Sequence, residues 1–321
     1  MTRWLAAALM LWPGVAVAED RLGWPVRCTL GETCFIQQFV DLDPGPDARD
    51  AACGFASYEG HTGTDIRTPQ IVDLGNAGTV VAALAGTVRA IRNDSADRLT
   101  LSPDDRAAVG DQQCGNGVVI DHAGGLQTQY CHLARSSVSV LPGDAVEAGQ
   151  AIGAIGLSGN TQFPHLEFIV RKDGVVVDPF SGHQAGGGCE AAGASLWADP
   201  ELLDAAQSST QLIGAGLSSA PIDHATLMQA DPLPLFAGAD AVVAWGWAIN
   251  VRTGDRFALM FTTPDGSRFD HASDPFARNQ ASRSAFAGER RMVVPGLYRG
   301  QVQLIRDGVA IDTLTFEVLV D

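Results

Sequence analysis

Short apolar and β-branched runs, separated by glycine-rich turns, are the feature that most constrains what this chain can fold into. Helical periodicity is weak from residue 24 to residue 180. Within this stretch Asp173-Gly174 separates two such runs, and Asp-Gly at that position is a strong hairpin signal. The pattern predicts an antiparallel all-β domain, with the polar, proline-containing stretches 41–50 and 94–113 as surface loops. The clearest runs are residues 79–91, 117–133 and 165–180.

A second β region follows a glycine- and alanine-rich connector. The Asp-Pro-Glu sequence at residue 199 predicts a short helix over 199–207. Beyond it, Pro264-Asp265-Gly266 and Asp307-Gly308 are turn signals between alternating runs, which favours a small immunoglobulin-like β-sandwich. Those runs are residues 241–249, 256–262 and 298–320.

The amino terminus has the layout of a secretory signal peptide. Arg3 precedes an apolar stretch, and Ala16-Val17-Ala18 is the small-residue pattern of a cleavage site. The stretch is too short to span a bilayer comfortably, and no later one approaches the required length. We expect a mature chain in the periplasm or outside the cell. The expected division is a signal peptide at 1–18, a first domain at 19–182, a connector with a short helix at 183–212 and the sandwich at 213–321.

Charge and cysteine content narrow the partners and the compartment. The formal net charge of −16 argues against a nucleic-acid binder. The six cysteines form an even set, and in an oxidising compartment such a set predicts disulfides. Cys28 and Cys34 bracket a short segment containing Gly31 and are the pair we assign. The pairing of the other four stays open.

Five polar residues in three places are the candidates for chemistry: His61 and Asp65 in GHTGTD, His132 in QYCHL, and His165 and Glu167 in PHLEF. Strand alternation places His165 and Glu167 on one face and Leu166 and Phe168 on the other, which is the predicted core face. The two polar side chains therefore project together from a rigid strand.

The same alternation, applied to residues 130–132, predicts Tyr130 and His132 on one face and Cys131 on the opposite face. Cys131 is therefore expected to be structural rather than a metal ligand. Tyr58, three residues before His61, is a candidate for an additional hydrogen bond, whose direction the sequence does not fix. The remaining histidines, at 122, 183, 224 and 271, lack partner spacing and are expected to be structural.

Between residues 53 and 179 the sequence resembles the lysostaphin-type, LytM-like zinc peptidases. The surrounding phrases AGTVRAI, GNGVVIDH and PGDAVEAGQAIGAIGLSGNT agree as well. The resemblance implies that His61 and Asp65, as H-x-x-x-D, are zinc ligands, that His165 and His132 are catalytic, and that residue 167 is the third ligand. It further implies one zinc ion, a narrow groove, and hydrolysis of peptidoglycan stem or crossbridge peptides.

Glu167 stands where the family has a histidine. A carboxylate can bind zinc, but a second ligand carboxylate cancels the charge of the metal and weakens it as a Lewis acid. Oxygen-rich coordination also admits manganese, although zinc is favoured. The alternative is a degenerate domain that binds or regulates other cell-wall enzymes, as some LytM-like domains do. In the second region, Trp245 and Trp247 share a strand face and are expected in the sandwich core rather than on a binding platform.

Overall fold

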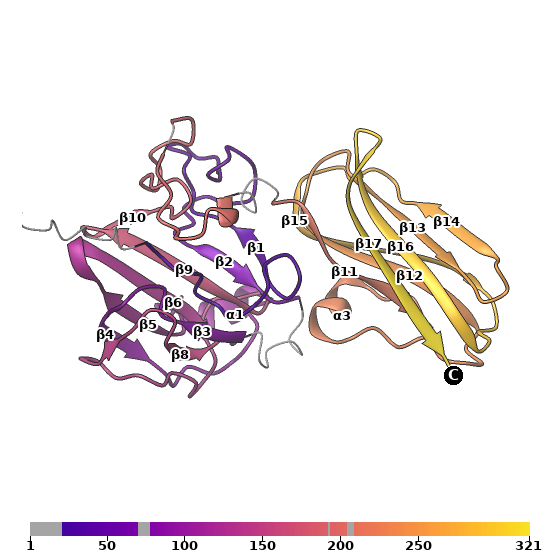
Figure 1. Ribbon diagram of the computed structural model, residues 1–321, viewed down its shortest axis with the longest axis horizontal. Coiled ribbons are helices and arrows are strands. Elements are labelled where there is room, and N and C mark those ends of the chain that lie inside the picture. Colours follow the sequence, from indigo (N-terminus) through magenta and orange to yellow (C-terminus); the bar gives the residue numbers. More distant parts are fainter. Residues whose placement is uncertain (1–20, 70–77, 192, 204–208) are drawn as a thin grey trace, which may run out of the picture.

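The computed structural model describes residues 21–69, 78–191, 193–203 and 209–321, which form two β-rich regions side by side (Figure 1). The predicted signal peptide, residues 1–18, lies outside the described residues. No helix in the described part of the chain is both long enough and apolar enough to cross a membrane.

The first region is built on one large antiparallel sheet, which confirms the all-β fold class. Each predicted run becomes a pair of strands. In the last of them, Asp173 and Gly174 have left-handed φ values of 51° and 84°, as a two-residue hairpin turn requires. The strands, in spatial order, are β1 (Phe35–Gln38), β2 (Thr64–Arg67), β9 (His165–Lys172), β6 (Leu126–Leu133), β5 (Asn116–Asp121), β4 (Gly86–Arg92) and β7 (Ala145–Val146), with β10 (Val175–Val177) beside β9 and a separate pair of β3 (Thr79–Val81) and β8 (Ala151–Ala154).

The core of the first region lies on the predicted face of β9. Leu166, Phe168 and Val170 are fully buried. The Trp197 ring, from the connector, packs on Phe168 with 5.7 Å between ring centroids. The opposite face of β9 is thereby left for polar side chains.

Three disulfides link the described residues, and no described cysteine is free. The predicted pair, Cys28–Cys34, is present. Cys53–Cys189 joins the segment before His61 to the connector, across a sequence separation of 136 residues. Cys114–Cys131 confirms that Cys131 is structural.

Two segments differ from the sequence prediction. The stretch 94–113, expected as a loop, contains helix α1 (Pro103–Val109), which begins with a capping box between Ser102 and Asp105. The signal was present in Ser-Pro-Asp-Asp, a helix start with proline in the first turn. Of the helix predicted over 199–207, residues 201–203 are helical and residues 204–208 lie outside the described residues.

The second region consists of two antiparallel sheets packed on a shared apolar core. Its immunoglobulin-like classification stays a prediction. Four of its elements were not predicted: β11 (Gln211–Ser218), β14 (Arg268–Ala272), β15 (Gln280–Arg290) and helix α3 (His224–Gln229). One sheet contains β11 (Gln211–Ser218), β12 (Ala241–Val251) and β15 (Gln280–Arg290), the other contains β14 (Arg268–Ala272), β13 (Arg256–Thr262), β16 (Gly296–Arg306) and β17 (Val309–Val320), and α3 spans His224–Gln229.

The two regions meet through an apolar cluster. Phe35 of β1 packs there with Trp247 and Ile249 of β12. The side chain of Asn250 donates a hydrogen bond to the Gln37 carbonyl oxygen at 2.7 Å. Trp247 therefore lies at the contact between the regions, and the expectation that it belongs to the sandwich core was wrong.

Candidate functional site

Two carboxylates face each other across adjacent strands of the large sheet. Asp65 on β2 is the direct partner of Glu167 on β9. Both are largely buried, with side-chain exposures of 5% and 16%. Directly opposed like charges destabilise a sheet, so this pair requires positive charge nearby.

His61 lies just before β2 and supplies one nitrogen to this pair. Its Nδ1 is 2.7 Å from the Phe39 carbonyl oxygen. Its Nε2 is 3.2 Å from Asp65 Oδ1 and 3.9 Å from Glu167 Oε1. A carbonyl acceptor at Nδ1 selects the tautomer that leaves Nε2 directed at the carboxylates.

His165 begins β9 and approaches from the other side of Asp65. Its Nδ1 is 2.9 Å from the Phe163 carbonyl oxygen, and its Nε2 is 3.6 Å from Asp65 Oδ1. The predicted shared face of His165 and Glu167 is therefore what places both side chains at the site.

His132 reaches the same site, but not by the alternation that the sequence suggested. Tyr130 lies in the core, 5.3 Å from the Phe168 ring, and Cys131 is opposite Glu167 in the strand register. Tyr130 and His132 therefore do not share a face by simple alternation, and that prediction was wrong. A left-handed φ of 62° at His132 turns its side chain back toward the site.

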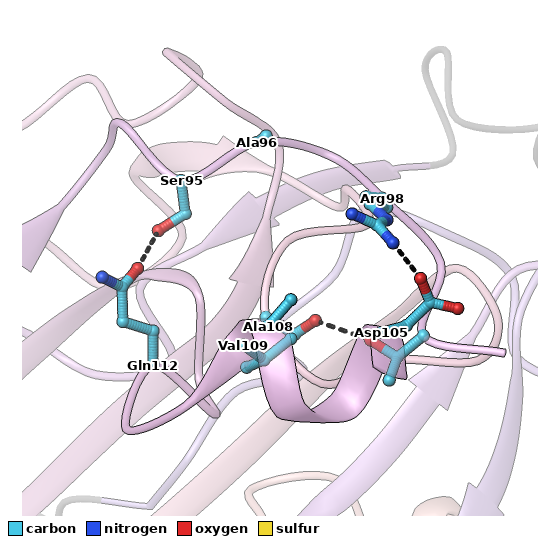
Figure 2. Close-up of a pocket in the computed structure, with 9 residues that line it drawn as sticks. Ser95, Ala96, Arg98, Asp105, Ala108, Val109 and Gln112 are labelled. Atoms are coloured by element: carbon cyan, nitrogen blue, oxygen red, sulfur yellow. Dashed lines mark hydrogen bonds and ion pairs between the residues drawn. The ribbon is translucent and has the colours of Figure 1, made fainter. Parts of the chain in front are cut away.

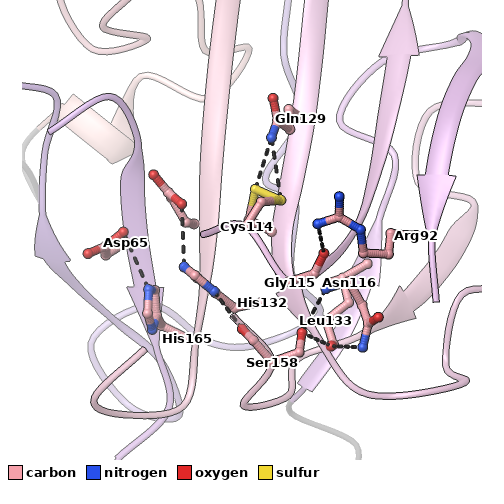
Figure 3. Close-up of a disulfide and its surroundings, with 12 residues drawn as sticks. Asp65, Arg92, Cys114, Gly115, Asn116, Gln129, His132, Leu133, Ser158 and His165 are labelled. Carbon is pink, nitrogen blue, oxygen red and sulfur yellow. Dashed lines mark hydrogen bonds and ion pairs between the residues drawn. A yellow bond between two sulfur atoms is a disulfide. The ribbon is translucent and has the colours of Figure 1, made fainter. Parts of the chain in front are cut away.

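Figure 3 shows the result around the Cys114–Cys131 disulfide. His132 Nδ1 is 2.8 Å from the Ser158 carbonyl oxygen, and its Nε2 is 3.4 Å from Glu167 Oε2. The His132 and His165 rings are 4.6 Å apart between centroids. All five candidate side chains thus converge on one place.

The charges in this cluster are mutually dependent. Burial opposes ionisation of Asp65, but the surrounding histidines hold its pKa below the usual range. Burial likewise opposes ionisation of Glu167, and His132 then lowers its pKa. Burial opposes protonation of His61, yet Asp65 and Glu167 raise its pKa to about 9. Burial lowers the pKa of His165 to about 4. The ionised carboxylates are balanced by protonated imidazole, a role that a bound cation can take over.

Tyr58 borders this cluster on the solvent side. Its ring lies 4.4 Å from the His61 ring, between centroids, at an interplanar angle of 30°. The side chain is 51% exposed. Tyr58 therefore links the buried cluster to the surface.

Residues 59–179 match the sequence profile of Peptidase family M23. The chain contains an M23 peptidase domain. The matched residues include all five candidate side chains, which come from the three motifs of the sequence analysis.

Curated relatives share only part of this chain. The DD-carboxypeptidase/endopeptidase Mpg of Neisseria meningitidis is 42% identical over 67 residues, which is 21% of this chain and 15% of that protein. Stage II sporulation protein Q of Bacillus subtilis is 29% identical over 150 residues, or 46% of this chain and 45% of that protein. The chain therefore spans less than half the length of either relative.

Among solved structures, a zinc containing peptidase from Vibrio cholerae is 24% identical, with a TM-score of 0.33, over 50% of this chain and 39% of that one.

The candidate ligand atoms of the M23 domain, imidazole nitrogen and carboxylate oxygens, are of the types that bind zinc. Peptidases of this family are zinc-dependent. With zinc bonds of about 2.0–2.2 Å, neighbouring ligand atoms in a tetrahedron lie roughly 3.3–3.5 Å apart. The distance of 3.2 Å between His61 Nε2 and Asp65 Oδ1 is close to this ligand spacing. The distance of 3.9 Å between His61 Nε2 and Glu167 Oε1 is longer. Among the described residues, no three His, Cys, Asp or Glu side chains are already arranged around a common metal position.

Sequence reasoning missed the groups that orient the M23 histidines. These are backbone carbonyl oxygens, which carry no residue signature. It also missed Gly63, where an added Cβ would lie 2.6 Å from Glu167 Cγ. The glycine stands inside GHTGTD and could have been noticed from its place between His61 and Asp65. The four other histidines are not part of the cluster.

Proposed function

We propose that this chain is an exported zinc metalloendopeptidase that hydrolyses amide bonds in peptidoglycan peptides. One observation carries the proposal. Three buried imidazoles, each held by a carbonyl at Nδ1, direct Nε2 toward two carboxylates that pair across β2 and β9.

In this proposal His61, Asp65 and Glu167 hold one zinc ion, with manganese as a less favoured occupant. When bound, zinc supplies Lewis acidity and lowers the pKa of a coordinated water toward about 7. His132 and His165 lie beside the ligands, with their Nε2 atoms directed toward Glu167 and Asp65 respectively. With zinc bound, one of these histidines would accept a proton from the attacking water, and the other would donate a hydrogen bond to the developing oxyanion.

Export to the periplasm or the exterior is part of the same proposal. It is supported by the signal-peptide pattern at residues 1–18 and by three disulfides in the described residues, since disulfides persist in oxidising compartments.

The test is metal analysis of the mature chain together with digestion of purified muropeptides. We expect one zinc per chain and release of cleaved peptides. His61→Ala should lose both the metal and at least about 100-fold of the activity, since it removes a ligand. A chain that holds no stoichiometric metal under non-chelating conditions would contradict the proposal.

A second candidate function is a binding or regulatory module for other cell-wall enzymes. Glu167 favours it, because this carboxylate approaches His132 more closely than it approaches His61. Glu167→His discriminates between the two: a large gain in hydrolysis means that the natural site is impaired, and a loss means that Glu167 is a working ligand. Glu147→His, at an exposed turn, is the matched control.

A further inference from the structure

A cleft of about 450 Å³ lies between the two regions and reaches Tyr58. The first region contributes Arg49, Phe55 and Tyr58, and the second contributes Asn250, Arg252 and Gln280. We propose that this cleft binds carboxylate groups of the peptide substrate through Arg49 and Arg252. The inference rests on the proposed function and assigns to the second region a part in substrate binding.

Two arginines from different regions converge on one aromatic ring. The guanidinium carbon of Arg49 is 4.8 Å from the centroid of Phe55, and that of Arg252 is 5.8 Å from it. The Phe55 side chain is 52% exposed. A ring attracts a cation without neutralising it, so the cleft keeps two positive charges.

Neither guanidinium has an ion pair or a hydrogen bond within the described part of the chain, although Asp47 also lines the cleft. Two arginines elsewhere in the chain are neutralised by carboxylates. Arg306 makes two contacts of 2.8 Å with the Asp255 carboxylate. In a smaller pocket beside α1, Arg98 faces Asp105 (Figure 2). Free guanidinium donors suit carboxylates, which they bind with two parallel hydrogen bonds.

The cleft adjoins the candidate metal site through Tyr58, whose ring contacts His61. The hydrogen bond from Asn250 to Gln37 fixes the end of β12 against β1, which holds Arg252 in place.

The test measures peptide binding to the metal-free chain, and muropeptide digestion by the metal-loaded chain is measured in parallel. Titration calorimetry is done on the full mature chain, freed of metal by a chelator, with a peptidoglycan stem peptide that has free carboxylates and with the same peptide amidated. We expect amidation to weaken binding about tenfold or more, as loss of charged hydrogen bonds does. The double variant Arg49→Gln/Arg252→Gln should bind both peptides equally weakly.

Arg268→Gln is the matched control, because this arginine lies on β14 and pairs with Asp270. It should retain the preference for the acidic peptide. Equal binding of the two peptides by the unmodified chain, or binding of neither, would overturn the inference. If the chain hydrolyses muropeptides but shows no carboxylate preference, the role assigned to the cleft is wrong and the proposed function stands. If the chain prefers the carboxylate peptide through its arginines but hydrolyses nothing, the proposed function is wrong and the role assigned to the cleft stands.

Discussion

At the scale of single residues, the site depends on side chains whose directions are fixed by close neighbours. Each histidine is oriented through Nδ1, and Glu167 is confined by Gly63. Small changes beside these groups should therefore act on the site without touching a candidate ligand.

Gly63→Ala should weaken zinc binding about tenfold or more, because a Cβ would lie 2.6 Å from Glu167 Cγ and 3.3 Å from Ile169 Cγ1. The measurement is competition with a chromogenic chelator. Gly78→Ala is the control, since its nearest neighbour would be Ile155 Cβ at 3.7 Å. Unchanged affinity in Gly63→Ala would show that Glu167 is not held by this contact.

Asp178 should make stability depend on pH. Burial raises its pKa to about 6, from the usual 3.8 of an aspartate. Between these values the folded chain holds a proton that the unfolded chain has lost, so stability falls as pH rises and stays lower above pH 6. The free energy of unfolding should fall by an amount on the order of 3 kcal/mol.

Asp178→Asn should remove this pH dependence of the free energy of unfolding. Urea unfolding at acidic and at neutral pH measures it. The exposed Asp111→Asn is the control. If the variant and the unmodified chain lost stability in parallel between those pH values, Asp178 would not be the cause.

At the scale of elements, the end of β6 determines where His132 points. Its amide donates to the Cys114 carbonyl oxygen at 2.8 Å, and Cys114 is bonded to the preceding residue, Cys131. The disulfide thus holds the segment at which strand alternation breaks.

Cys114→Ser/Cys131→Ser should lower the free energy of unfolding by about 3 kcal/mol and reduce hydrolysis more than stability alone explains. Thermal unfolding and muropeptide digestion measure the two effects. Cys28→Ser/Cys34→Ser is the control, because that disulfide has no contact with the site side chains and should lower stability only. Full activity in Cys114→Ser/Cys131→Ser would show that the disulfide is not needed to place His132.

At the scale of the whole molecule, the two regions share a buried contact. The Arg67 guanidinium is 4.8 Å from the Trp247 ring centroid, and Trp247 Nε1 donates to Ser282 Oγ at 2.8 Å. Arg67 is on β2, two residues after Asp65, so the contact between the regions is continuous with the strand that carries a candidate ligand.

Trp247→Ala should lower the free energy of unfolding by about 3–5 kcal/mol and uncouple the unfolding of the two regions. Calorimetry should then show two transitions where the unmodified chain shows one. Phe286→Ala, at a side chain that is 45% exposed, is the control. A single transition in Trp247→Ala would mean that the regions remain coupled by other contacts.

The sequence by itself determined the strand runs, the Asp173-Gly174 turn, one disulfide and the shared face of His165 and Glu167. These follow from local rules, since turn residues and two-residue alternation act over a few positions. It also supplied the motif order of the M23 domain.

Only the tertiary structure decided the pairing of Asp65 with Glu167, the direction of His132 and the place of Trp247. Strand register, a left-handed φ at a non-glycine residue and the contact of two regions all depend on partners distant in sequence. Local pattern cannot specify such partners, which is why alternation failed at His132 and why the convergence of Arg49 and Arg252 had no signal in the sequence.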